Sequence, residues 1–420
     1  MTSRIAQQVA RENGASPTRK DEVSAGLNRL SRWQTAALAA VCLLAVALRL
    51  LFAWWFLPPL ESDFYWYRLA GLAASQHGLA SLFSADPPVP MWVLSLWPPG
   101  YPLFLGLLYS VTGSIWVAPI VQSILGGLSC IFVFAAARRW GANPWAAAGT
   151  MALYPHAIVY SAIHGAETLA IFLLSIALFA GVTSLRTRRA VGYGLSLGLA
   201  ILTRCHTMLL MPGVILSLWS QRRALVIVLC CVALVLAPWA ITRSLAYHRP
   251  VFMTTFFGHL LYMGNYAENT TGGYYEAPTP IEIPGDVTPP EEDVYYTTAG
   301  VREILLHPWH YVLVSARRIA TWTGVDRDEW MQKYAPRWLG HLSLFAQLLL
   351  FFAAAAASIE SWRDPRARHV VWPALSLVLL TALTYHMPRY TLVALPYFAL
   401  IAARLRIRFD TVADAAPAPH

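Results

Sequence analysis

Long apolar runs alternate with short polar turns along most of the chain. The first run, from about Trp33 to Leu57, is long enough for one bilayer crossing, which takes roughly 20 helical residues. It is too long for the core of a signal peptide, and no small-residue cleavage site follows it. The pattern predicts an all-α polytopic membrane protein with about ten transmembrane helices. The nine further runs lie near residues 115–138, 145–162, 166–184, 190–203, 205–220, 223–243, 337–358, 369–386 and 389–406.

Three features interrupt this regular pattern. The runs 190–203 and 205–220 are each short for a full crossing, which leaves two alternatives: two tilted helices with Arg204 at the turn, or one long span. Residues 98–113 are apolar but broken by Pro and Gly, which favours an interfacial or re-entrant segment. Arg49 lies inside the first run, towards its outer end, where we expect its long side chain to reach the interface.

Composition excludes a water-soluble fold. Hydrophobic residues make up 57% of the 420 residues and charged residues 13%, whereas soluble domains average about 45–50% and about 25%. The net charge of +9 would permit a nucleic-acid partner, but its distribution gives another explanation. With the N-terminus in the cytoplasm, the cytoplasmic segments hold 19 of the 31 basic residues and 7 of the 22 acids, so they carry +12 and the other face −3. This bias predicts the orientation and implies no nucleic-acid partner.

The domain organisation follows from the same pattern. We expect a disordered cytoplasmic tail over 1–32, a transmembrane region over 33–406 and a second tail over 407–420. Two external loops, 58–114 and 244–336, are long enough to carry function. The part of the second loop from Glu268 to Asp293 has seven acids and no Lys or Arg, which favours an irregular lid. Residues 301–322 read as an amphipathic helix on the membrane surface, with Arg302, Arg317 and Arg318 facing the headgroups.

Two acidic side chains follow the first transmembrane run, in the sequence Glu61-Ser62-Asp63. Carboxylates next to lipid headgroups are electrostatically unfavourable unless a cation or a proton-donating substrate meets them. Such a carboxylate can act as general base on an acceptor hydroxyl or amine. A solvated helix N-terminus, where acids favour the helix dipole, is an equally weighted alternative.

Other polar residues fall at the same face in the predicted topology. His164 and Glu167 lie at the outer end of two spans, and Arg204 at the outer turn of the short pair. Arg389 and Tyr390 lie at the outer mouth of the last hairpin. Each arginine could simply reach the interface, but arginine also binds phosphate in a bidentate manner. Acids and arginines at one membrane surface suit a lipid-phosphate ligand together with a proton acceptor.

Seven motifs resemble, in this order, those of GT-C membrane glycosyltransferases. The resemblance covers most of residues 45–400 and is nearest to the bacterial family 39-like enzymes, similar to protein mannosyltransferases and the lipid A aminoarabinose transferase. Ser244 and Tyr266 stand where that pattern usually has Asn. The motifs are Glu61-Ser62-Asp63, WPPGYPLFL, HGAETLAIFLL, LTRCHTMLLMP, APWAITRSLAYHRPVFMTT, LLYMGNYAENTTGG and MPRYTLVALP.

The resemblance implies a GT-C-like helical bundle that moves a sugar, with inversion, from a polyprenyl-phosphate donor to a glycan, lipid or protein acceptor. It places the enzyme in a bacterial inner membrane, with the active site on the external face. It implies that Asp63 is the base and Glu61 a catalytic neighbour. It leaves open whether these two carboxylates hold a divalent cation as a cofactor. The substrate-binding residues that it implies are Arg204, Arg389, Tyr390, Glu167, His164 and Asn265.

One departure from the family concerns phosphate binding. Related transferases carry a charged or polar residue just before the Pro-Pro pair of the first loop, whereas Leu96 and Trp97 precede Pro98 here. That contribution is therefore absent or supplied elsewhere. Two other classes of function stay open, namely a transporter or flippase for a lipid-linked sugar and a non-catalytic binder of one. Inverted repeats would favour a transporter, and none is visible.

Overall fold

The computed structural model describes residues 30–84, 86–183, 185–273, 281–324, 332–333 and 335–405. Over these residues the chain forms helices and no strand, which confirms the all-α prediction. Most of the predicted tails, residues 1–29 and 406–420, lies outside the described part.

Eleven helices of the described part of the chain form the main bundle, and they match the predicted apolar runs. Among the described helices, α3, α7, α13 and α18 are long and apolar enough to cross a membrane, and the others are shorter. The bundle helices are α3 (Arg32–Trp55), α7 (Val117–Trp140), α8 (Pro144–Leu153), α9 (Pro155–Ala162), α10 (Glu167–Gly181), α11 (Thr187–Thr203), α12 (Met211–Leu218), α13 (Arg222–Tyr247), α18 (Arg337–Ser361), α19 (Arg368–Leu383) and α20 (Thr391–Ala402).

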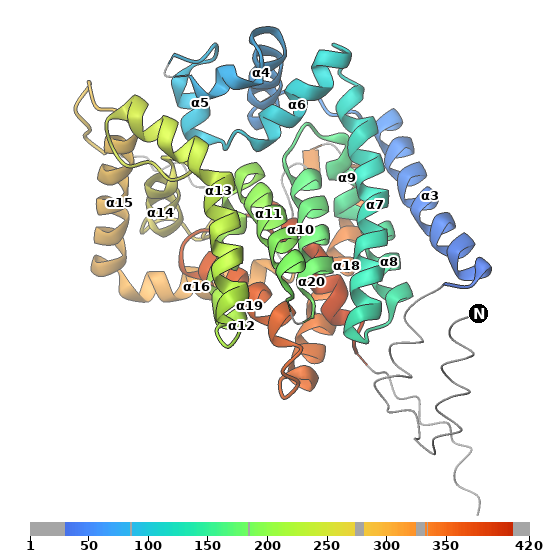
Figure 1. The fold of residues 1–420 in the computed structure, drawn as a ribbon. Helices are drawn as coiled ribbons and strands as arrows, with labels where there is room; N and C mark the ends of the chain where they lie inside the picture. The colour runs from blue at the N-terminus through green and yellow to red at the C-terminus, as the bar shows by residue number, and fades with distance from the viewer. Residues whose placement is uncertain are drawn as a thin grey trace, which may run out of the picture.

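Helices of the two long loops lie at one end and along one side of this bundle. The first loop forms a layer over one end, and the second lies beside α13 (Figure 1). Residues 98–113, expected as an interfacial or re-entrant segment, contain α6, which packs against α4 in that layer. The loop helices are α4 (Asp63–His77), α5 (Met91–Leu96), α6 (Gly100–Val111), α14 (Phe257–Asn265), α15 (Pro289–Leu306) and α16 (Pro308–Thr321), and the 3-10 turns are η1 (Leu79–Phe83), η2 (Cys205–Leu210) and η3 (Pro388–Tyr390).

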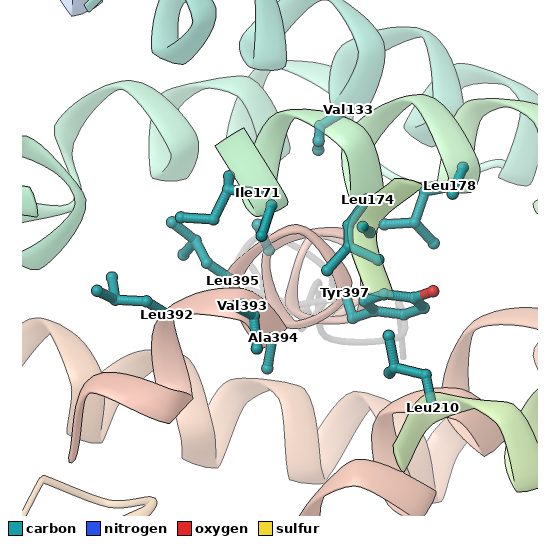
Figure 2. Close-up of a cluster of buried hydrophobic side chains, with 14 of the residues drawn as sticks. Val133, Ile171, Leu174, Leu178, Leu210, Leu392, Val393, Ala394, Leu395 and Tyr397 are labelled. Carbon is teal, nitrogen blue, oxygen red and sulfur yellow. The ribbon is translucent and has the colours of Figure 1, made fainter. Parts of the chain in front are cut away.

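The last helix, α20, runs through the middle of the core. It packs against α8, α10, α18 and α19. Figure 2 shows Leu395 and Tyr397 of α20 close to Ile171 and Leu174 of α10, and all four are at most 4% exposed. Because α20 touches helices from both halves of the bundle, its packing fixes η3, the turn that directly precedes it.

Two of the predicted spans are interrupted. The run 145–162 is not one helix: α8 ends at Leu153 and α9 begins at Pro155, because proline has no N–H to continue the ladder. The short pair follows the two-helix alternative. The α11 helix ends at Thr203, Arg204 is extended, and the turn η2 leads into α12.

Arg49 does not reach the interface as expected. Its side chain is 2% exposed and donates hydrogen bonds to the carbonyl oxygens of Ala45 at 3.0 Å, Met151 at 2.9 Å and Ala152 at 3.1 Å. The carbonyl of Met151 would normally accept from the N–H of residue 155, which is proline. The guanidinium therefore satisfies the backbone at the α8–α9 break.

The prediction for Arg318 is also wrong. The expected helix over 301–322 is broken at His307 into α15 and α16, and Arg302 is exposed while Arg318 is fully buried. Arg318 donates to the carbonyls of Gly272 at 2.7 Å, Ala382 at 3.1 Å and Gly264. Burial lowers the pKa of Arg318 to about 10, so it stays charged at neutral pH. It ties the second loop to the end of α19.

The acidic lid expected over 268–293 is described in part. Residues 274–280 lie outside the described part, 281–288 are irregular as expected, and helix α15 begins at Pro289, inside the predicted lid.

Candidate functional site

A cavity of about 550 Å³ is lined by residues of α4 and α5 and lies at the end of the bundle next to these helices. Segments far apart in sequence meet there, as the predicted topology required. Both acids of the first-loop motif line it, and so do three of the predicted binding residues. The predicted residues that line the cavity are Glu61, Asp63, Arg204, Arg389 and Tyr390, joined among others by Tyr67, Trp97, His206, Phe256 and Lys333.

A strained turn sets the position of Asp63. Ser62 has φ of 50°, a left-handed conformation that costs free energy for a residue other than glycine. This turn redirects the chain from the end of α3 into α4, whose first residue is Asp63. The N-terminus of a helix favours a negative charge, which stabilises the carboxylate there. The backbone strain and the position at a cavity wall favour the functional interpretation over a merely solvated helix start.

Asp63 pairs with Arg389 across the cavity. Arg389 Nη1 lies 2.9 Å from Asp63 Oδ2, and the two side chains are 14% and 17% exposed. The turn η3, which begins at Pro388, holds Arg389 at this place between α19 and α20. An arginine guanidinium is not deprotonated in proteins. Arg389 is therefore a permanent cation beside the acid.

A second ion pair, Arg204 with Glu167, lies deeper. Arg204 Nη2 is 3.0 Å from Glu167 Oε1, and the side chains are 8% and 1% exposed. Glu167 is the first residue of α10 and does not line the cavity; it lies behind Arg204. The glycine at 165 leaves room for this carboxylate, because a Cβ atom there would lie 2.5 Å from Glu167 Oε2 and the side chain would have to shift. Glu167 thus positions Arg204, which faces the cavity.

Tyr390 forms an aromatic surface on the same wall. Its ring stacks on that of His206 with centroids 4.2 Å apart and planes 11° apart. The Arg204 guanidinium carbon lies 5.5 Å from the centre of the Tyr390 ring, within cation–π range. The rings of Tyr67 and Trp97, 5.8 Å apart, line the cavity as well. Flat apolar faces beside charged groups suit a ligand with both a sugar-like and an anionic part.

Besides Glu167, two other predicted residues, His164 and Asn265, do not line the cavity. His164 is 2% exposed, and its pKa is lowered to about 4 by burial and by the charge of Arg68. Asn265 is 1% exposed, and its amide oxygen accepts from Arg318 at 3.1 Å. Both lie in the region that the topology predicted, but these contacts support the fold.

Lys333 is a cavity residue that the sequence pattern did not predict. This residue contributes to the cavity wall and pairs with Glu61, the two side chains being 52% and 38% exposed. The chain has two lysines, Lys20 in the predicted tail and Lys333 in the second external loop. The sequence does contain a signal for this residue: Lys333 is the one lysine in an external loop whose other Lys or Arg residues are all arginines.

The residues present do not favour a metal ion at the predicted acidic motif. Glu61 and Asp63 are each already paired with a basic side chain, so a divalent cation would have to displace Lys333 or Arg389. Among the described residues, no group of three or more His, Cys, Asp and Glu is placed to hold a metal. Positive charge at the cavity is supplied by side chains.

Comparisons with known proteins identify the fold. No protein-family profile matches the chain, and no curated protein matches it in sequence. The crystal structure of ArnT from Cupriavidus metallidurans bound to undecaprenyl phosphate aligns with 89% of this chain at 16% identity and a TM-score of 0.54. The chain has the GT-C fold. It spans 60% of the length of that ArnT chain. The Archaeoglobus fulgidus oligosaccharyltransferase aligns with 87% of the chain at 13% identity and a TM-score of 0.42, covering 48% of its own length.

Proposed function

We propose that this GT-C protein is a glycosyltransferase that moves a sugar from a polyprenyl-phosphate donor to an envelope acceptor. The observation that carries the proposal is one cavity that a carboxylate, Asp63, shares with two arginines, the buried Arg204 and the partly buried Arg389. The ArnT structure with the same fold was determined with undecaprenyl phosphate bound, which supports a polyprenyl phosphate as the ligand class.

The chemistry follows from the charges of the cavity. Asp63 accepts the proton of an acceptor hydroxyl or amine as that atom attacks the anomeric carbon. The bond from the anomeric carbon to the phosphate oxygen breaks, the configuration inverts, and the electron pair leaves with the polyprenyl phosphate. Arg204 and Arg389 donate hydrogen bonds to the phosphate as its negative charge grows. The low dielectric of a partly buried cavity strengthens these interactions.

Arg389 links the two halves of this reaction. A guanidinium has five N–H donors, so Arg389 can hold Asp63 and a phosphate oxygen at once. When Asp63 takes the acceptor proton it becomes neutral, and the positive charge of Arg389 is then balanced by the leaving phosphate alone. Proton transfer and departure of the phosphate therefore assist each other.

Lys333 supplies the cation that the first loop lacks. In this sequence Leu96 and Trp97 stand before Pro98 where relatives carry a charged or polar residue. Lys333 lines the same cavity from the second loop, and its pairing with Glu61 keeps its ammonium group there. We infer that Lys333 contacts the donor phosphate from the open side, opposite the two arginines.

The proposal includes the location and orientation of the protein. The transmembrane region over 33–406 would lie in a bacterial plasma membrane, with the N-terminus in the cytoplasm and the cavity at the external face. Support comes from the positive-inside rule: Arg138, Arg139 and Arg363 lie at the end of the bundle opposite the cavity. Accessibility of single cysteines introduced at the two ends to a membrane-impermeant reagent tests this orientation.

Mass spectrometry of the purified protein tests the function. Intact protein released from detergent should carry a polyprenyl phosphate or its sugar conjugate, and the conjugate's mass identifies the sugar. Incubation with that conjugate and envelope extract should yield a new glycoside and free polyprenyl phosphate. Movement of the conjugate across a vesicle membrane without a new glycoside would contradict the transferase and favour a flippase.

Replacing Arg389 by Ala should weaken donor binding. A charge-assisted hydrogen bond to phosphate contributes about 1.5–3 kcal/mol, which corresponds to roughly a tenfold to hundredfold rise in Kd. Titration with polyprenyl phosphate, read by native mass spectrometry, measures the change. Arg302→Ala is the matched control, because Arg302 is exposed and does not line the cavity. Equal affinity in the two variants would remove Arg389 from phosphate binding.

Lys333→Gln should have a smaller effect that depends on salt. Because the side chain is 52% exposed, screening limits its contribution. We expect the Kd for polyprenyl phosphate to rise by a factor of about three to ten at low ionic strength and to approach the wild-type value in 1 M salt. Arg337→Gln provides the control, since Arg337 is exposed on the same loop border but outside the cavity. A salt-independent loss would show that Lys333 acts through the fold.

A further inference from the structure

A second cavity, of about 620 Å³, lies at the opposite end of the bundle from the candidate site. Its walls come from the second half of α18 and the first half of α19, and α20, against which both helices pack, forms its floor. We call this cavity the α18–α19 groove. None of its lining residues belongs to the cavity that holds Asp63.

Small side chains create the groove. Residues 353–357 of α18 are all alanine, and two of them, Ala354 and Ala355, line it. Apart from Ser358 and the charged residues at one end, its other lining residues are apolar, with Phe398 of α20 in the floor. Ile359 at its edge is 78% exposed, so the groove opens sideways to the surroundings of the bundle. In a membrane those surroundings are acyl chains, which fill an open apolar groove without cost in solvation.

Two opposite charges stand at the end of the groove. Glu360 and Arg363 line it, are exposed, and form no ion pair with any residue that the structure describes. Asp364, only one residue further, is instead paired with Arg404 and so is not available. Trp362, which is 61% exposed and lines the same end, has the amphipathic ring that is typical of the headgroup level.

We propose that the α18–α19 groove binds one amine-bearing glycerophospholipid of the phosphatidylethanolamine type. Its acyl chains would lie along the alanine wall, its phosphate would contact Arg363, and its ammonium group would contact Glu360. An anionic lipid would satisfy the arginine but would bring a second negative group to Glu360, which disfavours it. This inference does not rest on the glycosyltransferase proposal, because the two cavities share no residue.

Filling the groove tests its occupation. Ala355→Trp places an indole in the groove at an exposed position, where the larger side chain does not overpack the core. Ala356→Trp is the matched control, because Ala356 is exposed on the same helix and does not line the groove. The protein is reconstituted in nanodiscs of equimolar phosphatidylethanolamine and phosphatidylglycerol, and the lipids retained on release are counted by native mass spectrometry. We expect one retained phosphatidylethanolamine in the wild type and the control and its loss in Ala355→Trp. Equal retention in both variants would overturn the proposal.

The headgroup contacts have separate tests. Arg363→Gln should lower retention of both lipids, by about tenfold for one charge-assisted bond to phosphate. Glu360→Gln should lower the ratio of phosphatidylethanolamine to phosphatidylglycerol, and an unchanged ratio would contradict the assigned headgroup.

Added polyprenyl phosphate distinguishes the two sites. If it displaces the retained phospholipid, and if Ala355→Trp loses polyprenyl phosphate, the groove holds the donor's tail and the phospholipid proposal fails while the transferase proposal stands.

Discussion

Asp63→Asn should abolish sugar transfer while polyprenyl-phosphate binding persists. Asparagine has the shape of aspartate, and its amide oxygen can still accept from Arg389, so the pair's geometry is kept. It cannot take the proton of the acceptor, and loss of a positioned general base costs about 10²- to 10⁴-fold in rate. Because Arg389 then lacks a negative partner, its guanidinium should bind donor phosphate at least as tightly as in the wild type.

Separate measurements of rate and binding make this prediction decisive. Transfer is followed by formation of the glycoside, and donor affinity is measured by titration with polyprenyl phosphate. Asp86→Asn is the control, since Asp86 is an exposed acid of the same loop that does not line the cavity. Near-normal transfer by Asp63→Asn would remove Asp63 from the mechanism. A parallel fall of transfer and donor binding would assign Asp63 a role in positioning Arg389.

The predicted topology was sufficient to bring the site residues to one end of the bundle. Apolar runs fix which end of each helix faces which side, so Asp63, Arg204 and Arg389 had to share a face. Hydropathy contains no information on position within the membrane plane. For that reason the pairs Asp63–Arg389 and Glu167–Arg204 could not be predicted, and His164 and Asn265 were placed in the site although they pack beside it.

Buried arginines show a second limit of sequence-based prediction. Arg49 and Arg318 look like residues that reach the headgroups, yet both bind backbone carbonyls of distant segments. Those carbonyls are free because of local breaks, at Pro155 in one case and in the loop around Gly272 in the other. A carbonyl that lacks its partner has no sequence signal of its own, so only the fold shows where such an arginine goes.

Glu167→Ala should destabilise the protein strongly. The Glu167–Arg204 pair is almost fully buried, and removing one partner of such a pair typically costs about 3–5 kcal/mol, because the other charge is left uncompensated. Thermal unfolding in detergent measures the loss. The double variant Glu167→Ala/Arg204→Met, which removes both charges, should be more stable than Glu167→Ala alone. If the stability lost in the double variant equals the sum of the losses in Glu167→Ala and in Arg204→Met, the two residues of the pair are not coupled.

The donor should partly rescue the Glu167→Ala variant, and this separates a phosphate-binding Arg204 from a purely structural one. In the variant the Arg204 guanidinium lacks its carboxylate but still faces the cavity. A ligand that binds only the folded state raises its stability by an amount that grows with affinity. Saturating polyprenyl phosphate should therefore raise the melting temperature of Glu167→Ala by more than that of the wild type, whereas the double variant should gain least. An equal rise in all three proteins would mean that Arg204 does not contact the phosphate, and the buried pair would then serve only to join α10 to the end of α11.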